Sequence, residues 1–288
     1  MNPLNPFSKI ALAQQEIQHA PILTPLQPQP IQTAYIHQGE GKIPILLLHG
    51  FDSSVLEFYR LVPRIKPKTE VWGIDLLGFG FSERHPRICY NPGSILSHLY
   101  HSWKTLIGQP LILLGASMGG ATAIDFTLAY PEIVQKLILI DSVGYGGGFP
   151  LGQFLVPPLD GWAVELWRQR KLQPLNWGLF GVGSSEELEA LRCVSLHLEM
   201  PGWVEAMISF TRSGGYLHLS DRISELNLPT LILWGDKDEM LGTEDALKFK
   251  RNIRNCEFRW ISNCGHAPHL EQPQVTAEYI LEFLDLNF

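Results

Sequence analysis

The sequence has few charged residues and no dense block of Lys or Arg. Asp, Glu, Lys and Arg together make up 18% of the 288 residues, whereas 45% are hydrophobic, and this balance argues against a disordered chain. The formal net charge is -7, which argues against a surface that binds nucleic acid. We therefore expect a well-packed acidic protein that does not bind nucleic acid.

Cysteine patterns typical of metal sites or disulfide frameworks are absent. The chain has 4 cysteines, and they are scattered without a C-x-x-C pair or another zinc-like spacing: Cys89, Cys193, Cys256 and Cys264. We expect free thiols in a reducing compartment and no structural metal.

Long apolar runs are missing as well. No stretch of about 18 consecutive apolar residues occurs, and residues 1–9 lack the basic segment and apolar core of a secretory signal. We expect no integral membrane segment and a cytoplasmic location. The length suits one large domain, or one domain that carries a sizeable insertion.

Short apolar runs alternate with longer amphipathic stretches along most of the chain. Several runs are apolar throughout, as in strands that are buried on both faces of a parallel sheet. The alternation predicts an α/β fold with a mostly parallel, doubly wound sheet and helices on both faces. The expected strands are 33–37, 43–48, 71–75, 111–114, 136–140, 230–234 and 257–261, and the expected helices are 93–107, 118–130, 243–252 and 272–286.

Two segments depart from this alternation. Residues 1–30 are polar and proline-rich, and we expect an extended N-terminal arm outside a core made of residues 31–143 and 221–288. Residues 144–220 begin with a glycine-rich stretch and continue with helix-like segments, which predicts a helical insertion. Its aromatic side chains either form a small core of their own or line an apolar pocket: Trp162, Trp167, Trp177, Trp203, Phe149, Phe154, Phe180 and Phe210.

A G-x-S-x-G motif lies between an expected strand and an expected helix. It reads Gly115-Ala116-Ser117-Met118-Gly119, and it makes Ser117 the candidate nucleophile. Such a turn holds its serine in a strained backbone conformation, and the flanking glycines let strand and helix approach closely. The pentapeptide alone is weak because it arises often by chance, so the other residues must decide.

A serine hydroxyl needs a base, which is most often a histidine. We favour His266, which follows Gly265 in the loop after the last expected strand, over its neighbour His269. Other histidines, among them His98, His101 and His218, lie in helical or inserted stretches and are expected to be surface or packing residues.

The base in turn needs a carboxylate to orient it. We favour Asp238, in the loop after the strand 230–234, and Asp141, at the end of the strand 136–140, is the rival. Asp236 is expected to brace the turn, and Glu239 lies one step further out. The chain order Ser117, Asp238, His266 is that of α/β-hydrolases.

The oxyanion of a tetrahedral intermediate needs backbone N–H donors. We expect them from Met118, directly after the serine, and from Phe51, in the loop after the strand 43–48. Gly50 permits the turn of that loop, and His49 is expected to hydrogen-bond its backbone. The chemistry requires no metal and no organic cofactor.

Taken together, these motifs resemble the α/β-hydrolase superfamily in its lid-bearing branch, over roughly residue 32 to the C-terminus. The resemblance implies that residues 144–220 form a lid and that Asp75 and Ser82 are scaffold residues near the site. Serine at position 117 speaks against epoxide hydrolases and haloalkane dehalogenases, which carry aspartate there. The motifs are His49-Gly50-Phe51, Asp75-Leu76-Leu77-Gly78-Phe79-Gly80-Phe81-Ser82, Gly115-Ala116-Ser117-Met118-Gly119-Gly120, Gly235-Asp236-Lys237-Asp238 and Gly265-His266.

Three functions fit these residues. The first is a serine hydrolase of a small to medium, largely apolar acyl compound, most simply a carboxylic ester. The second is a C–C bond hydrolase with the same triad, and its acidic substrates would favour an arginine facing the pocket. The third is a receptor-like protein that binds a ligand with slow or no turnover. The arginines of the insertion that could serve the second function are Arg168, Arg170, Arg192 and Arg212.

Overall fold

An eight-stranded sheet runs through the molecule in the order β1-β2-β4-β3-β5-β6-β7-β8. The computed structural model describes residues 13–178, 185–193 and 195–285. β2 is antiparallel to both of its neighbours, and all other strand pairs are parallel. The strands are β1 (Gln18–Thr24), β2 (Gln27–Gln38), β3 (Ile45–Leu48), β4 (Val71–Ile74), β5 (Leu111–Ala116), β6 (Val134–Ile140), β7 (Thr230–Gly235) and β8 (Cys256–Ile261).

Helices cover both faces of this sheet, which confirms the predicted α/β class. Successive side chains of a strand point to opposite faces, so Leu46 and Leu48 of β3 pack in one core and Ile45 and Leu47 in another. The first core contains residues of α3 (Pro92–Leu106), α4 (Met118–Ala129) and α8 (Glu244–Asn252). The second contains residues of α2 (Val62–Ile65) and α10 (Pro273–Asp285).

The N-terminal segment differs from the prediction of an arm outside the core. Residues 1–12 lie outside the described residues, but β1 and the first part of β2 fall within residues 18–30 and form a hairpin on the edge of the sheet. Proline is tolerated there because an edge strand needs only half of its backbone donors. Pro21 lies on the edge strand, and Pro28 and Pro30 precede the part of β2 that pairs with β4.

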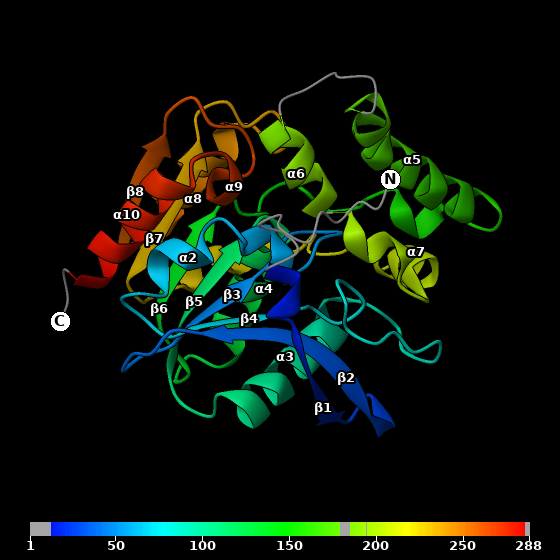
Figure 1. Ribbon diagram of the computed structural model, residues 1–288, viewed down its shortest axis with the longest axis horizontal. Coiled ribbons are helices and arrows are strands. Elements are labelled where there is room, and N and C mark those ends of the chain that lie inside the picture. Colours follow the sequence, from blue (N-terminus) through cyan, green and yellow to red (C-terminus); the bar gives the residue numbers. More distant parts are fainter. Residues whose placement is uncertain (1–12, 179–184, 194, 286–288) are drawn as a thin grey trace.

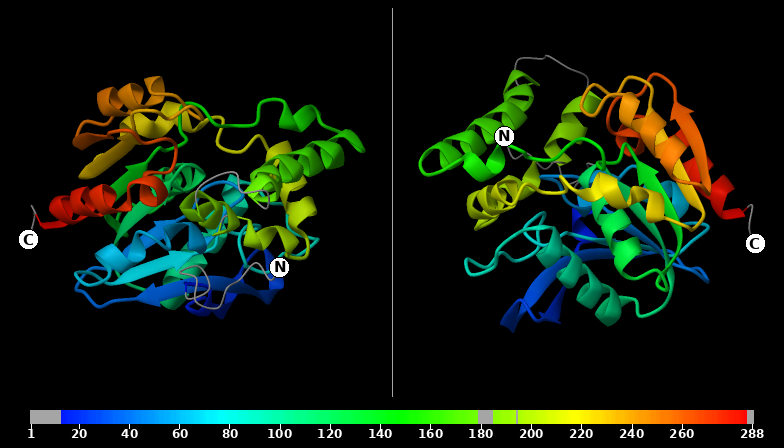
Figure 2. Two further views of the ribbon diagram at one scale, coloured as in Figure 1. Left: turned by 45° about the horizontal axis from the view of Figure 1, so that its top comes forward. Right: turned by 180° about the vertical axis from the view of Figure 1, so that it is seen from behind.

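The predicted insertion consists of the elements between β6 and β7, and we call residues 141–229 the inserted segment. Figures 1 and 2 show its longer helices gathered at one end of the molecule, away from the C-terminal end of α10. Its described elements are η2 (Gly152–Phe154), α5 (Leu159–Gly178), α6 (Ser185–Cys193), η3 (Leu196–Glu199), α7 (Trp203–Arg212) and η4 (Leu219–Glu225). Two further short elements, η1 (Val55–Phe58) and α9 (Pro268–Glu271), follow β3 and β8.

Candidate active site

Ser117 occupies the single residue between β5 and α4. Its backbone has φ 51° and ψ -118°, in the left-handed region that costs a side-chain-bearing residue free energy. The neighbouring glycines are required by contact: a Cβ on Gly115 would lie 2.2 Å from the carbonyl oxygen of Gly119, and one on Gly119 would lie 2.0 Å from that of Leu48. The turn therefore lifts Ser117 out of the sheet beside the end of β3.

His266 and Asp238 meet Ser117 at the carboxyl ends of the strands. Ser117 Oγ lies 2.9 Å from His266 Nε2, and His266 Nδ1 lies 2.9 Å from Asp238 Oδ2. Asp238 Oδ1 accepts hydrogen bonds from the N–H groups of Met240, at 2.8 Å, and Leu241, at 3.2 Å. Burial opposes the charge of Asp238, but the hydrogen bond with His266, the charge interaction with His266 and the N–H groups of Leu241 and Met240 together lower the pKa of this carboxyl. An ionised carboxylate fixes His266 with its N–H on Nδ1 and a lone pair toward Ser117.

The rival histidine, His269, is buried and engaged elsewhere. Its Nε2 lies 3.3 Å from Glu57 Oε1, and both oxygens of Glu57 accept the N–H of Gly50 at 3.1 Å. Burial acts to raise the pKa of Glu57, but the hydrogen bond from His269 and the charge interactions with His269 and His49 together lower it overall. His269 thus supports the loop after β3 through Glu57 and does not contact Ser117.

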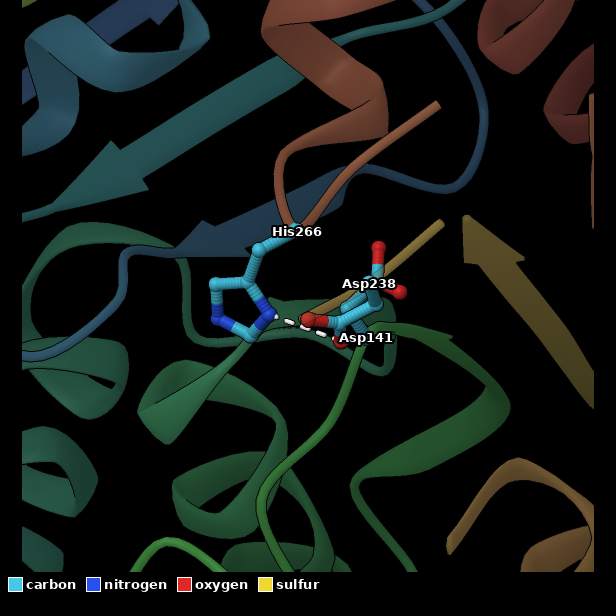
Figure 3. A group of neighbouring side chains, drawn as sticks. All are labelled: Asp141, Asp238 and His266. Carbon is cyan, nitrogen blue, oxygen red and sulfur yellow. Dashed lines mark hydrogen bonds and ion pairs between the residues drawn. The ribbon is translucent and has the colours of Figure 1, made fainter. Parts of the chain in front are cut away.

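The rival acid, Asp141, lies behind Asp238 and does not bond to His266. It directly follows β6 and has φ 39°, and its Oδ1 accepts the N–H of Gly235 at 2.9 Å. Burial, together with the negative charges of Asp238 and Glu271, raises the pKa of Asp141 to about 9. Figure 3 shows the carboxyl groups of Asp141 and Asp238 side by side, with the hydrogen bond to His266 made by Asp238.

The two expected oxyanion donors flank the serine. A Cβ on Gly50 would lie 3.3 Å from Ser117 Cβ, so the loop that carries Phe51 passes directly beside the nucleophile. Met118 begins α4, and the first N–H groups of a helix have no partner within the helix. His49 holds this loop as predicted: its Nε2 accepts the N–H of Leu76 at 3.0 Å, which leaves Nδ1 to donate to the Gly50 carbonyl at 2.8 Å.

Asp52 is a buried hub that joins this loop to the inserted segment. Only 1% of the surface of Asp52 is exposed, and its carboxylate accepts four hydrogen bonds from side chains of α5, η3 and α7. The donors are Trp167 Nε1 at 2.9 Å, Lys171 Nζ at 2.9 Å, His197 Nε2 at 2.9 Å and Trp203 Nε1 at 2.8 Å. Lys171 also donates to the Asp52 backbone carbonyl.

The charges in this hub are one carboxylate and one ammonium. Burial would raise the pKa of Asp52, but the hydrogen bond from His197 and the charge of Lys171 lower it well below its usual range. Burial lowers the pKa of His197 to about 4, so this ring is a neutral donor at neutral pH. Burial also lowers the pKa of Lys171, against the attraction of Asp52. A buried pair of this kind is tolerated because every charged atom has a partner.

A cavity of about 450 Å³ opens onto Ser117 and His266. A second cavity of about 320 Å³ lies under the inserted segment, and Phe51 and Trp167 line both. We call them the catalytic cavity and the side cavity. The side cavity is lined mostly by apolar groups: Phe51, Gly148, Phe149, Pro150, Leu151, Gly152, Leu155, Asp160, Ala163, Val164, Trp167, Met207 and Thr211.

The predicted aromatic residues of the insertion divide between the two expected roles. Trp203 and Phe210 are buried in the core, whereas Trp167 and Phe149 line cavities. Trp162 and Phe154 are 68% and 70% exposed, so they serve neither role. Phe180 and the side chain of Trp177 lie outside what the structure describes.

Of the four arginines considered for the insertion, Arg170 is the one that lines the catalytic cavity. Within the described residues it forms no hydrogen bond or ion pair. Arg168 lies 3.8 Å from Glu165, Arg212 pairs with Asp160 at 2.8 Å, and Arg192 is exposed.

Asp141, Asp238 and His266 also have the side-chain types of a metal site. Their potential ligand atoms all lie within 4.8 Å of one another. Both ring nitrogens of His266 are engaged, however, one with Asp238 and the other with Ser117. The hydrogen bonds of His266 with Asp238 and Ser117 account for the closeness of these side chains. All four cysteines are free thiols, as expected.

Sequence reasoning missed Asp52, Glu57 and Lys171. Asp52 directly follows His49-Gly50-Phe51, so its place in the motif was a usable signal. Glu57 and Lys171 gave none: Glu57 lies in η1 just after this loop without a recognisable motif, and Lys171 comes from α5, which meets the loop only in the folded chain.

Comparison with known proteins supports this fold. The family model described as alpha/beta hydrolase family matches residues 45–279. The chain belongs to the alpha/beta hydrolase family. A curated relative, the alpha/beta hydrolase domain-containing protein VTE7 of Arabidopsis thaliana, is 34% identical over 85% of this chain and 75% of its own length.

Other similar hydrolases have more specific names. The 2-hydroxy-6-oxononadienedioate/2-hydroxy-6-oxononatrienedioate hydrolase 2 of Pseudomonas putida is 26% identical over 88% of this chain and 92% of its own length. A thermophilic esterase from Thermogutta terrifontis superposes with a TM-score of 0.76 at 23% identity, covering 93% of this chain and 98% of the esterase. The meta-cleavage product hydrolase of Pseudomonas fluorescens IP01 gives 0.74 at 24%, covering 95% and 100%. The two structural likenesses support the fold.

None of the helices in the described part of the chain combines the length and the apolar character needed to cross a bilayer.

Replacing Asp52 by Asn tests the hub. The change leaves Lys171 buried without its counter-charge, so we expect the free energy of unfolding to fall by about 3–5 kcal/mol, measured by denaturant titration. The matched control is Asp160→Asn, which removes the partly exposed pair with Arg212 and should cost about 0–1 kcal/mol. Equal losses in both variants would show that the hub does not stabilise the fold.

Proposed function

We propose that this enzyme is a serine hydrolase that cleaves a carboxylic ester of largely apolar character. Ser117 attacks the carbonyl carbon while His266 takes its proton, and Asp238 orients His266 and stabilises the imidazolium. The N–H groups of Phe51 and Met118 bind the oxyanion. His266 then returns its proton to the leaving alcohol, and water releases the acyl group by the same steps.

The observation that carries this proposal is the continuous hydrogen-bonded chain from Ser117 to Asp238. Both links measure 2.9 Å, and the third residue has a lowered pKa, as an orienting carboxylate requires. The serine end of this chain opens into the catalytic cavity, where a substrate carbonyl can approach it. A nucleophile, its base and an orienting group in hydrogen-bond contact are the recognised features of acyl transfer.

The side cavity supports the proposal that the substrate carries an apolar acyl chain. Phe51, whose N–H is the proposed oxyanion donor, lines both cavities, and its ring lies 4.8 Å from the ring of Phe149 and 5.9 Å from that of Trp167. In the proposal, a chain attached to a carbonyl at Ser117 passes Phe51 and Trp167 and occupies the side cavity. Residues 144–220, which contribute most of this lining, act in the proposal as the lid over the substrate.

Replacing Ser117 by Ala should abolish turnover of short p-nitrophenyl esters, with a loss of about 10⁴-fold or more in kcat, and should abolish labelling by a fluorophosphonate probe. The matched control is Ser53→Ala, because Ser53 lines the same cavity without a hydrogen bond to His266. Labelling should persist in that control. Undiminished turnover in the Ser117 variant would contradict the proposal.

Replacing Ala163 by Phe should shorten the preferred acyl chain. The new ring enters the side cavity, and displacing two methylenes at about 0.8 kcal/mol each corresponds to a loss of about tenfold in kcat/KM on long-chain p-nitrophenyl esters. Short-chain esters should be much less affected. Gln169→Phe places the same ring on an exposed position of α5 outside the lining. An unchanged chain-length profile in the Ala163 variant would remove the side cavity from the substrate site.

A second candidate is a C–C bond hydrolase, favoured by the position of Arg170. A guanidinium beside the catalytic cavity that has no partner among the described residues is suited to bind a substrate carboxylate. Relatives such as that of Pseudomonas putida are named for dienedioate substrates. The same Ser117 and His266 would serve, with a carbon leaving group in place of an alcohol.

Assays with an ester and with an acidic dienoic diketone separate the two candidates. For the ester hydrolase we expect ester turnover that changes less than about threefold in Arg170→Gln, and little turnover of the diketone. Turnover of the diketone that exceeds ester turnover and falls by 10-fold or more in this variant would favour the C–C hydrolase, because a charged hydrogen bond contributes about 1.5–3 kcal/mol. Arg168→Gln, on the same helix outside the lining, is the control.

A further inference from the structure

Two carboxyl groups lie side by side behind His266. Asp141 directly follows β6, and Asp238 lies in the loop after the neighbouring strand β7. Both residues are buried, with 0% and 4% of their surface exposed. Their oxygens and the nearest nitrogen of His266 lie within 4.8 Å of one another. Two ionised carboxylates this close in a buried site repel each other strongly, so the pair requires a proton or a cation.

The hydrogen bonds show which of the two groups lacks a partner. Asp238 accepts from His266 on one oxygen and from the N–H groups of Met240 and Leu241 on the other, so both oxygens are satisfied as acceptors. Asp141 accepts the N–H of Gly235 on Oδ1 only. Its Oδ2 is buried and has no donor among the described residues. An ionised oxygen left in this way is costly, whereas a protonated oxygen would be a donor that faces an acceptor.

The backbone holds Asp141 in this position at a cost. Its φ of 39° is in the left-handed region, and its N–H donates to the carbonyl of Leu233 in β7 at 3.0 Å. A side chain that is not glycine occupies this conformation only where the surrounding contacts compensate. This backbone conformation holds the carboxyl of Asp141 beside that of Asp238.

We propose that Asp141 is a positioning residue that carries a proton at neutral pH and donates it in a hydrogen bond to Asp238. The chain of Ser117, His266 and Asp238 then has a fourth member, and the buried pair of carboxyls bears one negative charge. This inference rests on the proposed function, because its effect on catalysis acts through His266.

The electrostatic surroundings agree with a neutral Asp141. Burial is the main cause that raises its pKa to about 9, and the N–H of Gly235 acts in the opposite direction. The negative charges that face it are Asp238, from the loop after β7, and Glu271, from α9, and both raise its pKa further. His266, from the loop after β8, is the titratable base in the group.

Replacing Asp141 by Asn and by Ala tests the proposal. Asn has the bonding pattern of a protonated Asp, because its carbonyl can accept from Gly235 and its amide can donate to Asp238. Ala removes both interactions. On the ester that Ser117 hydrolyses, we expect Asp141→Ala to lose about 10-fold or more in kcat with little change in KM, and Asp141→Asn to recover most of that loss.

The pH profile distinguishes positioning from a merely structural role. In the wild type, Asp141 loses its proton as the pH rises through about 9, which removes its hydrogen bond and adds a second negative charge beside Asp238. We expect a change in kcat near that pH in the wild type and its absence in Asp141→Asn. The control Asp236→Asn changes an acid that braces the turn through Cys264 N–H, and it should keep the wild-type profile.

Two results would overturn the proposal. If Asp141 is ionised at neutral pH, Asn removes a negative charge near His266 and shifts the acid limb of kcat/KM downward, while the alkaline limb stays as in the wild type. The infrared difference spectrum would also lack a carboxylic-acid C=O band that disappears in Asp141→Asn. This band reports the proton on Asp141 without turnover, so it remains readable if the serine hydrolase assignment itself fails.

Discussion

The site depends on the close approach of three backbone segments around Ser117. Strand β5 turns into α4 within one residue, and α4 begins so near the end of β3 that a methyl group at Gly119 would lie 2.0 Å from the carbonyl oxygen of Leu48. This approach places the serine beside the loop that carries Phe51 and points it at the loop that carries His266. The proposed oxyanion donors and the base are thus brought to Ser117 by backbone segments that leave no room for a methyl group at Gly115 or Gly119.

Much of this arrangement could be predicted from the sequence because the signals are local. The apolar runs of the central strands and the glycines around Ser117 indicate their structure through patterns of only a few residues. The expected strands and the four expected helices are confirmed. The geometry also brings Ser117, Asp238 and His266 together in the predicted order. Their catalytic roles remain proposals. Chain order carried this prediction, because strand ends of a parallel sheet meet on one edge.

The remainder depends on contacts between distant residues, which leave no local pattern. Asp52 bonds to four side chains that are more than 110 positions away in the chain, and none of them has a recognisable spacing relative to it. The sequence offers Asp141 and Asp238 as alternative acids for His266. The adjacent parallel strands β6 and β7 bring both carboxyls close together, and each has its own hydrogen-bond partner. The prolines of residues 18–30 predict an arm because proline is rare inside sheets. The position of the hairpin at the edge of the sheet depends on tertiary pairing, which the local sequence does not indicate.

The Asp52 hub makes the inserted segment and the loop after β3 mechanically dependent on each other. Asp52 is the next residue after Phe51, and its carboxylate is held by Trp167, Lys171, His197 and Trp203 of the inserted segment. Any motion that lifts these helices to admit a substrate must break hydrogen bonds next to the proposed oxyanion donor. Such a motion would therefore weaken the support of the Phe51 loop at the moment when a substrate enters, and the support would return only when the four hydrogen bonds form again.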